Sequence, residues 1–251
     1  MKNTFDSLCK RENPALGFFI GESSLSVAEM VGYAGYDYMR VDTEHTLMDA
    51  SNLQNIIRIC DSFNMPTLIR VPDYDDFTKI LDFGATGILV PGISSVEQAK
   101  ECVQLCKYAP IGQRGMGTSS RHTKYGLENF DDFMKASYKN TSLCMQIETE
   151  QGVKDIEKIL SIEGVDLVAV GEHDLAQSMG YAGQPAHPEV TKAKHKVLET
   201  ALRLGVNPVV TATNPKAYAE YKAMGIKLLT ICFDNAFIFK AIRDHIAQFR
   251  Q

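Results

Sequence analysis

The sequence predicts a (β/α)8 barrel of the TIM type, formed by residues 1–251 as a single domain. Three observations predict this fold. Short apolar segments alternate with longer amphipathic segments eight times along the chain. The apolar segments are continuous, which indicates strands that are buried on both faces, as in parallel sheets. Eight such pairs in 251 residues match the usual size of this barrel, and 45% apolar residues suffice for one large core.

Four strand–helix pairs are predicted in the first half of the chain. Each strand is an apolar run, and each helix is an amphipathic segment. Gly84 closes the third helix, as glycine often does, and Pro91 ends the fourth strand because proline cannot donate to a sheet. The predicted strands are 15–20, 36–41, 67–71 and 87–90, and the predicted helices are 25–33, 49–63, 74–83 and 96–107.

The second half of the chain supplies the other four pairs after a long polar loop, 112–126, and a helix at 127–138. The predicted strands are 143–147, 167–170, 207–210 and 227–231, and the predicted helices are 152–160, 191–204, 215–224 and 236–249. The alternative is a doubly wound open sheet, which usually carries a G-x-G-x-x-G turn after its first strand. Here that turn reads GESS, so the barrel is favoured.

Charge and hydropathy argue against two classes of partner. The formal net charge is −5 and no basic stripe is present, which argues against binding to nucleic acid. No apolar run is long enough to span a bilayer, and the start of the chain lacks the apolar segment of a signal peptide. We therefore expect a cytoplasmic protein that acts on small molecules.

Two carboxylates follow neighbouring predicted strands. Glu148 comes directly after the fifth strand, and Asp174 comes shortly after the sixth. The carboxyl ends of parallel strands share one rim, so the two side chains should converge. Two carboxylates in one cleft favour a cation between them, and oxygen ligands suit Mg²⁺, Mn²⁺ or Co²⁺. Taken singly, Asp174 could merely cap a helix, and Glu148 could merely be an acid at a helix N-terminus that the helix dipole favours.

Three other candidates lie at the same predicted rim. Arg70, at the end of the third strand, could bind a carboxylate or a developing enolate oxygen. His45, oriented by Asp42, could transfer a proton. The plainer alternatives are an ion pair between Arg70 and Glu44 and a structural role for His45. Together with the two carboxylates, this set suits the formation of an enolate from a 2-oxo acid.

Two other chemistries are disfavoured by the residues at the strand ends. A Schiff base needs an amine in the pocket, and no lysine lies at the carboxyl end of a predicted strand. The phosphate site common in barrels lies after strands seven and eight, but the loops there contain no glycine.

The sequence resembles the HpcH/HpaI aldolase family of class II, divalent-metal-dependent pyruvate aldolases. The resemblance implies a barrel of the phosphoenolpyruvate/pyruvate-binding type. Six segments carry it, in the family's order. They are VDTEH (41–45), LIRVP (68–72), LDFGATGILVP (81–91), KYAPIGQRGMG (107–117), QIETEQGV (146–153) and GVDLVAVGEHDLAQSMG (164–180).

The resemblance implies a role for each of these residues. Glu148 and Asp174 would hold the metal ion. Arg70 would bind pyruvate and stabilise its enolate, and His45 with Asp42 would transfer the proton. The implied reaction is the reversible aldol cleavage of a 4-hydroxy-2-oxo acid to pyruvate and an aldehyde.

The segment before Asp174 departs from the family pattern, which usually has Gly-Pro ahead of the residue preceding the aspartate. Glu172 and His173 stand here and could supply a third ligand, a proton donor or a surface ion pair. His173 would also provide the backbone that binds the pyruvate carboxylate, and Gln146 belongs to the substrate site through its motif. Because these changes surround the substrate, three alternatives stay open: 2-oxo acid decarboxylation, cleavage of an acyl-CoA carbon–carbon bond, and a non-enzymatic binding or assembly module.

Two further expectations concern the acceptor and the assembly. Arg114 and Arg121, in the loop 112–126, could bind an acidic group on the aldehyde, although an ordinary solvated loop would have the same composition. The resemblance implies a homo-oligomer, often a hexamer, with the last helix packed on a neighbouring subunit. An intramolecular barrel helix would have a similar sequence.

Overall fold

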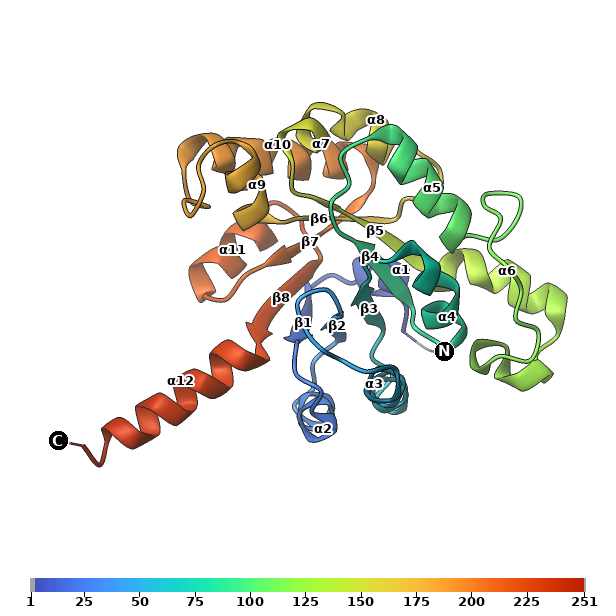
Figure 1. Cartoon of the computed structure of the whole chain (residues 1–251), viewed down its shortest axis with the longest axis horizontal. Helices are drawn as coiled ribbons and strands as arrows, with labels where there is room; N and C mark the ends of the chain where they lie inside the picture. Colours follow the sequence, from blue (N-terminus) through green and yellow to red (C-terminus); the bar gives the residue numbers. More distant parts are fainter. Residues whose placement is uncertain (1–2, 251) are drawn as a thin grey trace.

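The computed structural model describes residues 3–250 and shows a closed barrel of eight parallel strands, β1 to β8 in chain order (Figure 1). The predicted (β/α)8 barrel is confirmed. The strands are β1 (Ala15–Ile20), β2 (Tyr38–Asp42), β3 (Thr67–Arg70), β4 (Gly87–Val90), β5 (Ser142–Ile147), β6 (Leu167–Val170), β7 (Asn207–Thr211) and β8 (Leu228–Phe233).

The helices that follow these strands surround most of the barrel. The predicted helix 74–83 is a 3₁₀ turn, η1 (Tyr74–Asp76), continued by α4, and the predicted helix 152–160 bends at Asp155 into α7 and α8. The helices are α2 (Leu25–Tyr33), α3 (Ala50–Ser62), α4 (Phe77–Asp82), α5 (Val96–Cys106), α6 (Phe130–Asn140), α7 (Glu150–Lys154), α8 (Ile156–Leu160), α9 (Glu172–Ser178), α10 (Pro188–Leu204), α11 (Pro215–Ala223) and α12 (Asp234–Ala247), and a 3₁₀ segment, η2 (Arg121–Gly126), precedes α6.

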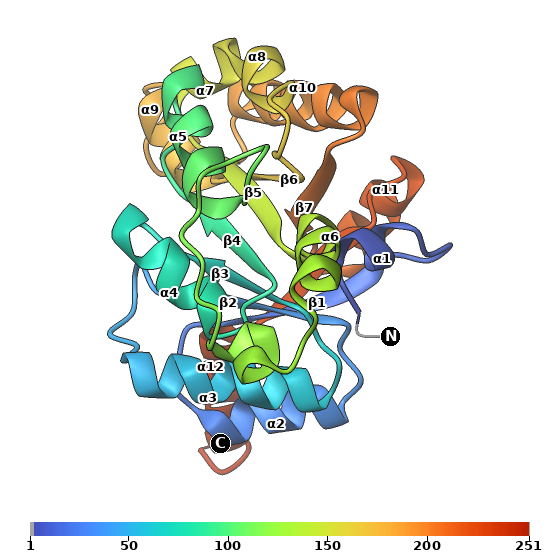
Figure 2. The ribbon, with the colours of Figure 1, turned by 90° about the vertical axis from the view of Figure 1, so that its right-hand side faces the viewer.

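A short helix that the sequence analysis missed, α1 (Phe5–Cys9), closes the amino-terminal end of the barrel. Its side chains Phe5 and Leu8 are fully buried in the cluster that fills the barrel interior, against Tyr38 and Leu68 near the starts of β2 and β3. Figure 2 shows α1 at the opposite end of the barrel from α9. Five residues are too few to show a helical period, so only the tertiary structure reveals this element.

The two faces of each strand serve different layers. In β2, Met39 and Val41 lie in the large cluster between the barrel and the surrounding helices, whereas Tyr38, Arg40 and Asp42 alternate with them on the inward face. The inner face is apolar near the strand starts and becomes polar towards the carboxyl ends. This gradient places the polar side chains at the rim where the candidate residues were expected.

The last helix, α12, leaves the barrel instead of covering it (Figure 1). Its first residue, Asp234, is buried and accepts hydrogen bonds from the backbone N–H groups of Gly21 and Glu22, at 2.9 and 2.8 Å. Beyond that anchor the helix is exposed, with Phe239 at 65% and Ile242 at 62%. Within residues 3–250, no helix is both long and apolar enough to span a membrane.

Candidate functional site

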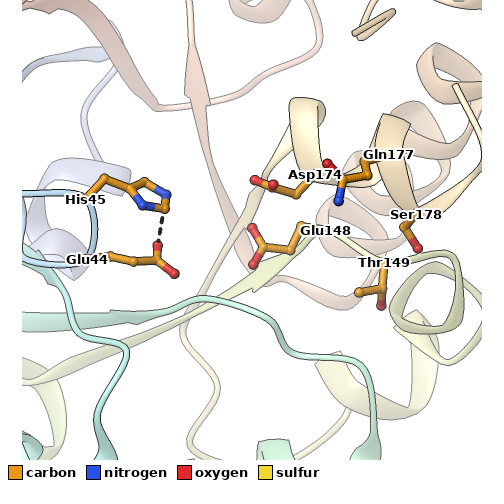
Figure 3. Close-up of a pocket in the computed structure, with 7 residues that line it drawn as sticks. All are labelled: Glu44, His45, Glu148, Thr149, Asp174, Gln177 and Ser178. Carbon is orange, nitrogen blue, oxygen red and sulfur yellow. Dashed lines mark ion pairs between the residues drawn. The ribbon is translucent and has the colours of Figure 1, made fainter. Parts of the chain in front are cut away.

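Glu148 and Asp174 converge at the carboxyl-terminal rim, as the strand order predicted. Glu148 follows β5 directly, and Asp174 lies in the first turn of α9, which begins just after β6. Both carboxylates face one cavity of about 400 Å³ (Figure 3). The other residues that line it are Glu44, His45, Thr149, Gln177 and Ser178.

Glu148 is fixed from three sides. The Gly92 backbone N–H donates to its Oε1 at 2.6 Å, and Gln146 Nε2 donates to its Oε2 at 2.5 Å. A Cβ at Gly171 would lie 2.4 Å from Oε2 and 2.9 Å from the Cβ of Glu148, so a side chain at position 171 would displace Glu148. Burial raises the pKa of Glu148, and the negative charge of Asp174 adds to this effect, whereas the two hydrogen bonds oppose it. The pair therefore favours a neighbouring cation.

The donor set fits a divalent ion that keeps part of its water shell. Among residues 3–250, no group of three or more Asp, Glu, His or Cys side chains is placed to hold a metal. Glu148 and Asp174 supply oxygen ligands beside an open cavity, and Mg²⁺ is commonly bound through one or two carboxylates plus waters. The site does not suit a closed structural zinc centre, which needs four protein ligands.

Arg70 is held by Asp42 in a two-point ion pair. Its Nε and Nη2 donate to the two oxygens of Asp42 at 2.8 and 2.6 Å, and its Nη1 lies 3.3 Å from Glu44 Oε2. The Arg70–Glu44 pair considered from the sequence is thus present. Burial would raise the pKa of Asp42, but the hydrogen bonds from Arg70 and from the Glu44 backbone lower it more strongly. The result is a rigid, charged guanidinium at the rim.

Within residues 3–250, Asp42 contacts His45 through the backbone and forms no hydrogen bond with the imidazole. Asp42 accepts a long hydrogen bond, 3.5 Å, from the backbone N–H of His45, and it also accepts from the backbone N–H of Glu44 at 3.0 Å and from Arg70. The imidazole Nε2 instead lies 3.6 Å from Glu44 Oε2 (Figure 3). Glu44 is therefore the acid beside the imidazole, whereas the Asp42 carboxylate is engaged by Arg70. The ring is 65% exposed and lies at the mouth of the cavity.

Glu172 and His173 have different surroundings, although they are adjacent in sequence. Glu172 forms an ion pair with Lys194 on α10, with 3.0 Å between Oε2 and Nζ. Of the three roles considered for it, an ion pair is the one that this contact matches. His173 lies in the exposed first turn of α9 and lines a second cavity of about 320 Å³. His45 and Asp174 line both cavities, so the two open onto the same rim.

Two cationic residues of the second cavity were missed by reasoning from the strand ends. Lys194 comes from the helical layer, and Arg40 lies in the middle of β2. Burial alone would lower the pKa of Lys194, but Glu172 and Tyr221 raise it above its ordinary value. Lys194 is therefore protonated and is not the neutral amine that a Schiff base requires. The sequence signal for Arg40 was a charged residue between the apolar residues Met39 and Val41, whereas Lys194 lies in a charged stretch of α10 and carried no such signal.

The loop 112–126 is tied to the outer helices. Arg114 is 5% exposed and pairs with Asp82 of α4 at 2.5 Å, and Arg121 pairs with Asp61 of α3 at 2.5 Å. Neither arginine lines either of the two cavities. These contacts give no support to the expected role of Arg114 and Arg121 in binding the aldehyde partner.

His122, in the same loop, should make stability depend on pH. Its Nδ1 lies 2.9 Å from Ser120 Oγ and its Nε2 lies 3.1 Å from Tyr108 Oη. Burial, and then the charge of Arg114, lowers the pKa of His122 from 6.5 to about 4. The unfolded chain therefore takes up a proton at higher pH than the folded protein, so stability falls as the pH drops from 6.5 to about 4.

We expect this loss to be on the order of 1–2 kcal/mol for His122, measured as the difference in the free energy of unfolding by urea at pH 7 and pH 5. In His122→Gln the free energies of unfolding at pH 7 and pH 5 should differ by less than they do in the unsubstituted protein. An unchanged difference would show that other groups cause the dependence.

Comparison with known proteins adds to the geometry. The family model described as HpcH/HpaI aldolase/citrate lyase matches residues 15–240. A 4-hydroxy-2-oxo-heptane-1,7-dioate aldolase from Shigella sonnei is 29% identical over 253 residues, covering 99% of this chain and 95% of the relative. A 2-dehydro-3,6-dideoxy-6-sulfogluconate aldolase from Pseudomonas putida is 28% identical, covering 94% of this chain and 93% of the relative.

Among solved structures, the citrate synthase SbnG superposes with a TM-score of 0.90 at 25% sequence identity, covering 99% of this chain and 98% of SbnG. The similarity therefore extends over the whole barrel, in sequence and in structure.

Proposed function

The chain belongs to the HpcH/HpaI aldolase/citrate lyase family, and from this premise we propose that it is a lyase that reversibly cleaves a 4-hydroxy-2-oxo acid to pyruvate and an aldehyde. The observation that carries the proposal is the convergence of Glu148 and Asp174 on one cavity, next to the cavity that Arg70 lines. The aldolase names of the relatives from Shigella sonnei and Pseudomonas putida support the same reaction class.

Glu148 and Asp174 are the proposed ligands of a divalent cation, Mg²⁺, Mn²⁺ or Co²⁺. When bound, such an ion supplies a Lewis acid that polarises the 2-oxo group. Gln146 positions Glu148 through its 2.5 Å hydrogen bond, and Gly92 does so from the other side. These two donors leave the free edges of the carboxylate for the ion.

Arg70 is the proposed residue that stabilises the oxygen on which negative charge develops when the carbon–carbon bond breaks. Its bidentate pair with Asp42 holds the guanidinium in one orientation before the substrate arrives. The backbone at His173, in the first turn of α9, is the proposed site for the carboxylate of the 2-oxo acid, since helix N-termini favour anions.

His45 is the proposed base that removes the proton from the C4 hydroxyl group. Glu44 lies 3.6 Å from its Nε2, so the protonated imidazole would have a carboxylate beside it. The imidazole is largely exposed, which suits transfer through a water molecule. In this arrangement Asp42 is a positioning residue for Arg70, and for His45 only through the backbone.

The test is proton exchange at the methyl group of pyruvate, which requires no knowledge of the aldehyde. Pyruvate is incubated in D₂O with the protein and Mg²⁺, Mn²⁺ or Co²⁺, and deuterium incorporation is followed by NMR. We expect exchange that depends on both the protein and the ion. Folded protein that binds the ion but shows no exchange with any of the three would overturn the proposed function.

A second candidate function is favoured by the similarity to the citrate synthase SbnG. The same enolate-stabilising residues would then act on a bond between an acyl-CoA carbon and a 2-oxo acid. Identification of the products distinguishes the candidates, because aldol cleavage releases pyruvate and an aldehyde, cleavage of the acyl-CoA bond releases a 2-oxo acid and a shorter acyl-CoA, and decarboxylation releases CO₂.

A homo-oligomer is the proposed assembly, with α12 packed on a second copy of the chain. Phe239, Ile242 and Ile246 recur at helical spacing, and each is at least 45% exposed. Soluble monomers rarely leave such a continuous apolar stripe uncovered. A hexamer is the form implied by the family resemblance.

The double substitution Phe239→Glu and Ile242→Glu should therefore reduce the oligomer to smaller species, measured by light scattering after size-exclusion chromatography. The matched control is Lys240→Glu, which changes charge on the same helix outside the stripe and should leave the mass unchanged. An unchanged mass in the double variant would contradict this role of α12.

A further inference from the structure

Asp174 lacks the fixed surroundings of Glu148. The Glu148 carboxylate accepts hydrogen bonds from Gly92 and Gln146, whereas the Asp174 carboxylate forms no hydrogen bond or ion pair with any of residues 3–250. Its direction towards the cavity (Figure 3) is therefore set by the backbone that carries it, the first turn of α9. Because Mg²⁺ tolerates little deviation in the positions of its ligands, this turn must itself be fixed if Asp174 is to bind such an ion.

The start of α9 has little rigidity of its own. The helix has seven residues, and its N-cap is Gly171, which offers no side chain to the free N–H groups of the first turn. Glycine also has the greatest backbone freedom of any residue. Leu175 and Ala176 bury the following turn, but Asp174 lies before them. The first turn thus depends on contacts from outside the helix.

Glu172, the first residue of α9, ties this turn to two other helices. Its Oε2 lies 3.0 Å from Nζ of Lys194 on α10, whose side chain is 16% exposed. The same ammonium group lies 5.9 Å from the centre of the ring of Tyr221 on α11, and Tyr221 is buried. Glu172 is therefore paired with a cation that is itself held by packing, and this contact lies two residues before Asp174.

We propose that the ion pair between Glu172 and Lys194 positions Asp174 for the divalent cation. The pair joins the first turn of α9 to the helical layer and so fixes the direction in which the Asp174 side chain leaves the backbone. Glu172 is a positioning residue here, because its carboxylate is engaged by the ammonium group. This inference rests on the proposed function, since it concerns the cation site of that reaction. Groups that orient a metal ligand typically contribute about 10- to 100-fold to metal affinity.

Positioning and charge alone predict opposite effects of Lys194 on the cation. Through space, a positive charge repels a divalent ion, so its removal in Lys194→Met would strengthen Mn²⁺ binding, and removal of the negative charge in Glu172→Gln would weaken it. Loss of positioning instead weakens Mn²⁺ binding in both variants. In the double variant Glu172→Gln with Lys194→Met the removed charges cancel, whereas the contact is still lost.

The test is Mn²⁺ binding, measured by calorimetry on the unsubstituted protein, the two single variants and the double variant. We expect the Kd to rise about tenfold or more in all three variants, the lower end of the range for groups that orient a metal ligand. The double variant should bind no more weakly than the weaker single variant, because the same contact is lost in each. Binding by Lys194→Met that equals or exceeds that of the unsubstituted protein would overturn the proposal.

The matched control is Arg203→Met, which also removes a positive charge from α10. Arg203 pairs with Glu157 on α8 at 3.0 Å, and neither residue lines either of the two cavities. Mn²⁺ affinity should be unchanged in this variant. A loss of affinity as large as that in Lys194→Met would show that any ion pair between the outer helices has this effect, and would overturn the specific role of Glu172 and Lys194.

A measurement of stability separates positioning from a general structural role. Both side chains of the pair are partly exposed, so the melting temperature of metal-free Lys194→Met should fall by no more than about 4 °C, the scale of one such ion pair in a domain of this size. A larger fall in melting temperature with unchanged Mn²⁺ affinity would mean that the pair stabilises the fold and does not position Asp174.

Pyruvate exchange in the unsubstituted protein tests the proposed function separately. Exchange in that protein, together with normal Mn²⁺ binding in the variants, would refute only the positioning role. Weakened Mn²⁺ binding in the variants, with no exchange in the unsubstituted protein, would refute only the lyase reaction. Failure of the unsubstituted protein to bind Mn²⁺ would overturn both.

Discussion

Glu148→Gln is expected to slow metal-dependent exchange at the pyruvate methyl group by about three orders of magnitude, the upper range for losing one electrostatic group from a preorganised site. Glutamine has nearly the same shape but lacks the charge that a divalent ion needs. Its side-chain oxygen can still accept the hydrogen bond from Gly92. The measurements are the exchange rate by NMR and Mn²⁺ binding by calorimetry, with Asp174→Asn as the parallel variant.

Stability provides the internal control for Glu148→Gln. Folding raises the pKa of Glu148 chiefly through burial, so its ionised form is disfavoured in the folded, metal-free protein. The stability cost of that form appears as the pH rises above the ordinary pKa of glutamate. Metal-free Glu148→Gln should therefore melt at the same temperature as the unsubstituted protein or higher. Glu150→Gln, two residues away and outside both cavities, should leave exchange unchanged. Normal exchange in Glu148→Gln would remove this residue from the proposed cation site.

Arg70→Met is expected to slow exchange by about 10²–10³-fold and to destabilise the fold by about 3 kcal/mol. The loss of exchange follows from the missing guanidinium at the developing oxyanion. The loss of stability follows because Asp42, which is 3% exposed, would keep a buried negative charge without its partner. Mn²⁺ binding should persist, since Glu148 and Asp174 are unchanged.

The double variant Asp42→Asn with Arg70→Met separates the two effects of Arg70. Removal of the unpaired carboxylate should restore most of the free energy of unfolding, measured with urea, while exchange stays slow. Recovery of exchange in the double variant would show that Arg70 contributes only by neutralising Asp42. The exchange rate of Arg70→Lys should lie between those of the unsubstituted protein and Arg70→Met, because lysine keeps the charge but not the two-point contact.

Much of the fold could be predicted because a barrel strand has a strong local signature. β1, β4 and β6 begin and end where the apolar runs predicted, and the other strands differ by one or two residues at one or both ends. A strand buried on both faces must be apolar throughout, so its boundaries appear in the composition itself. The helix boundaries differ more, as at α7 and α8, because a bend of the chain at Asp155 leaves no apolar signal.

The candidate site was predictable only where its chemistry coincides with the end of a strand. Glu148, Asp174 and Arg70 were found because parallel topology brings the carboxyl ends of strands to one rim. Lys194 lies on a helix and Arg40 lies inside the barrel, so their proximity to that rim depends on packing. The sequence also could not show which acid faces the His45 imidazole, since side-chain rotamers decide between Asp42 and Glu44.

The sequence by itself determined the barrel, the order of its strands and the rim that carries the two carboxylates. These features follow from the period of apolar residues along the chain, which is a local property. Only the tertiary structure decided which charges neutralise one another, that β6 and β7 pair at only two positions, and that α12 leaves the barrel with its apolar stripe uncovered. Ion pairs and exposed faces depend on distances between residues far apart in sequence, and composition does not fix those distances.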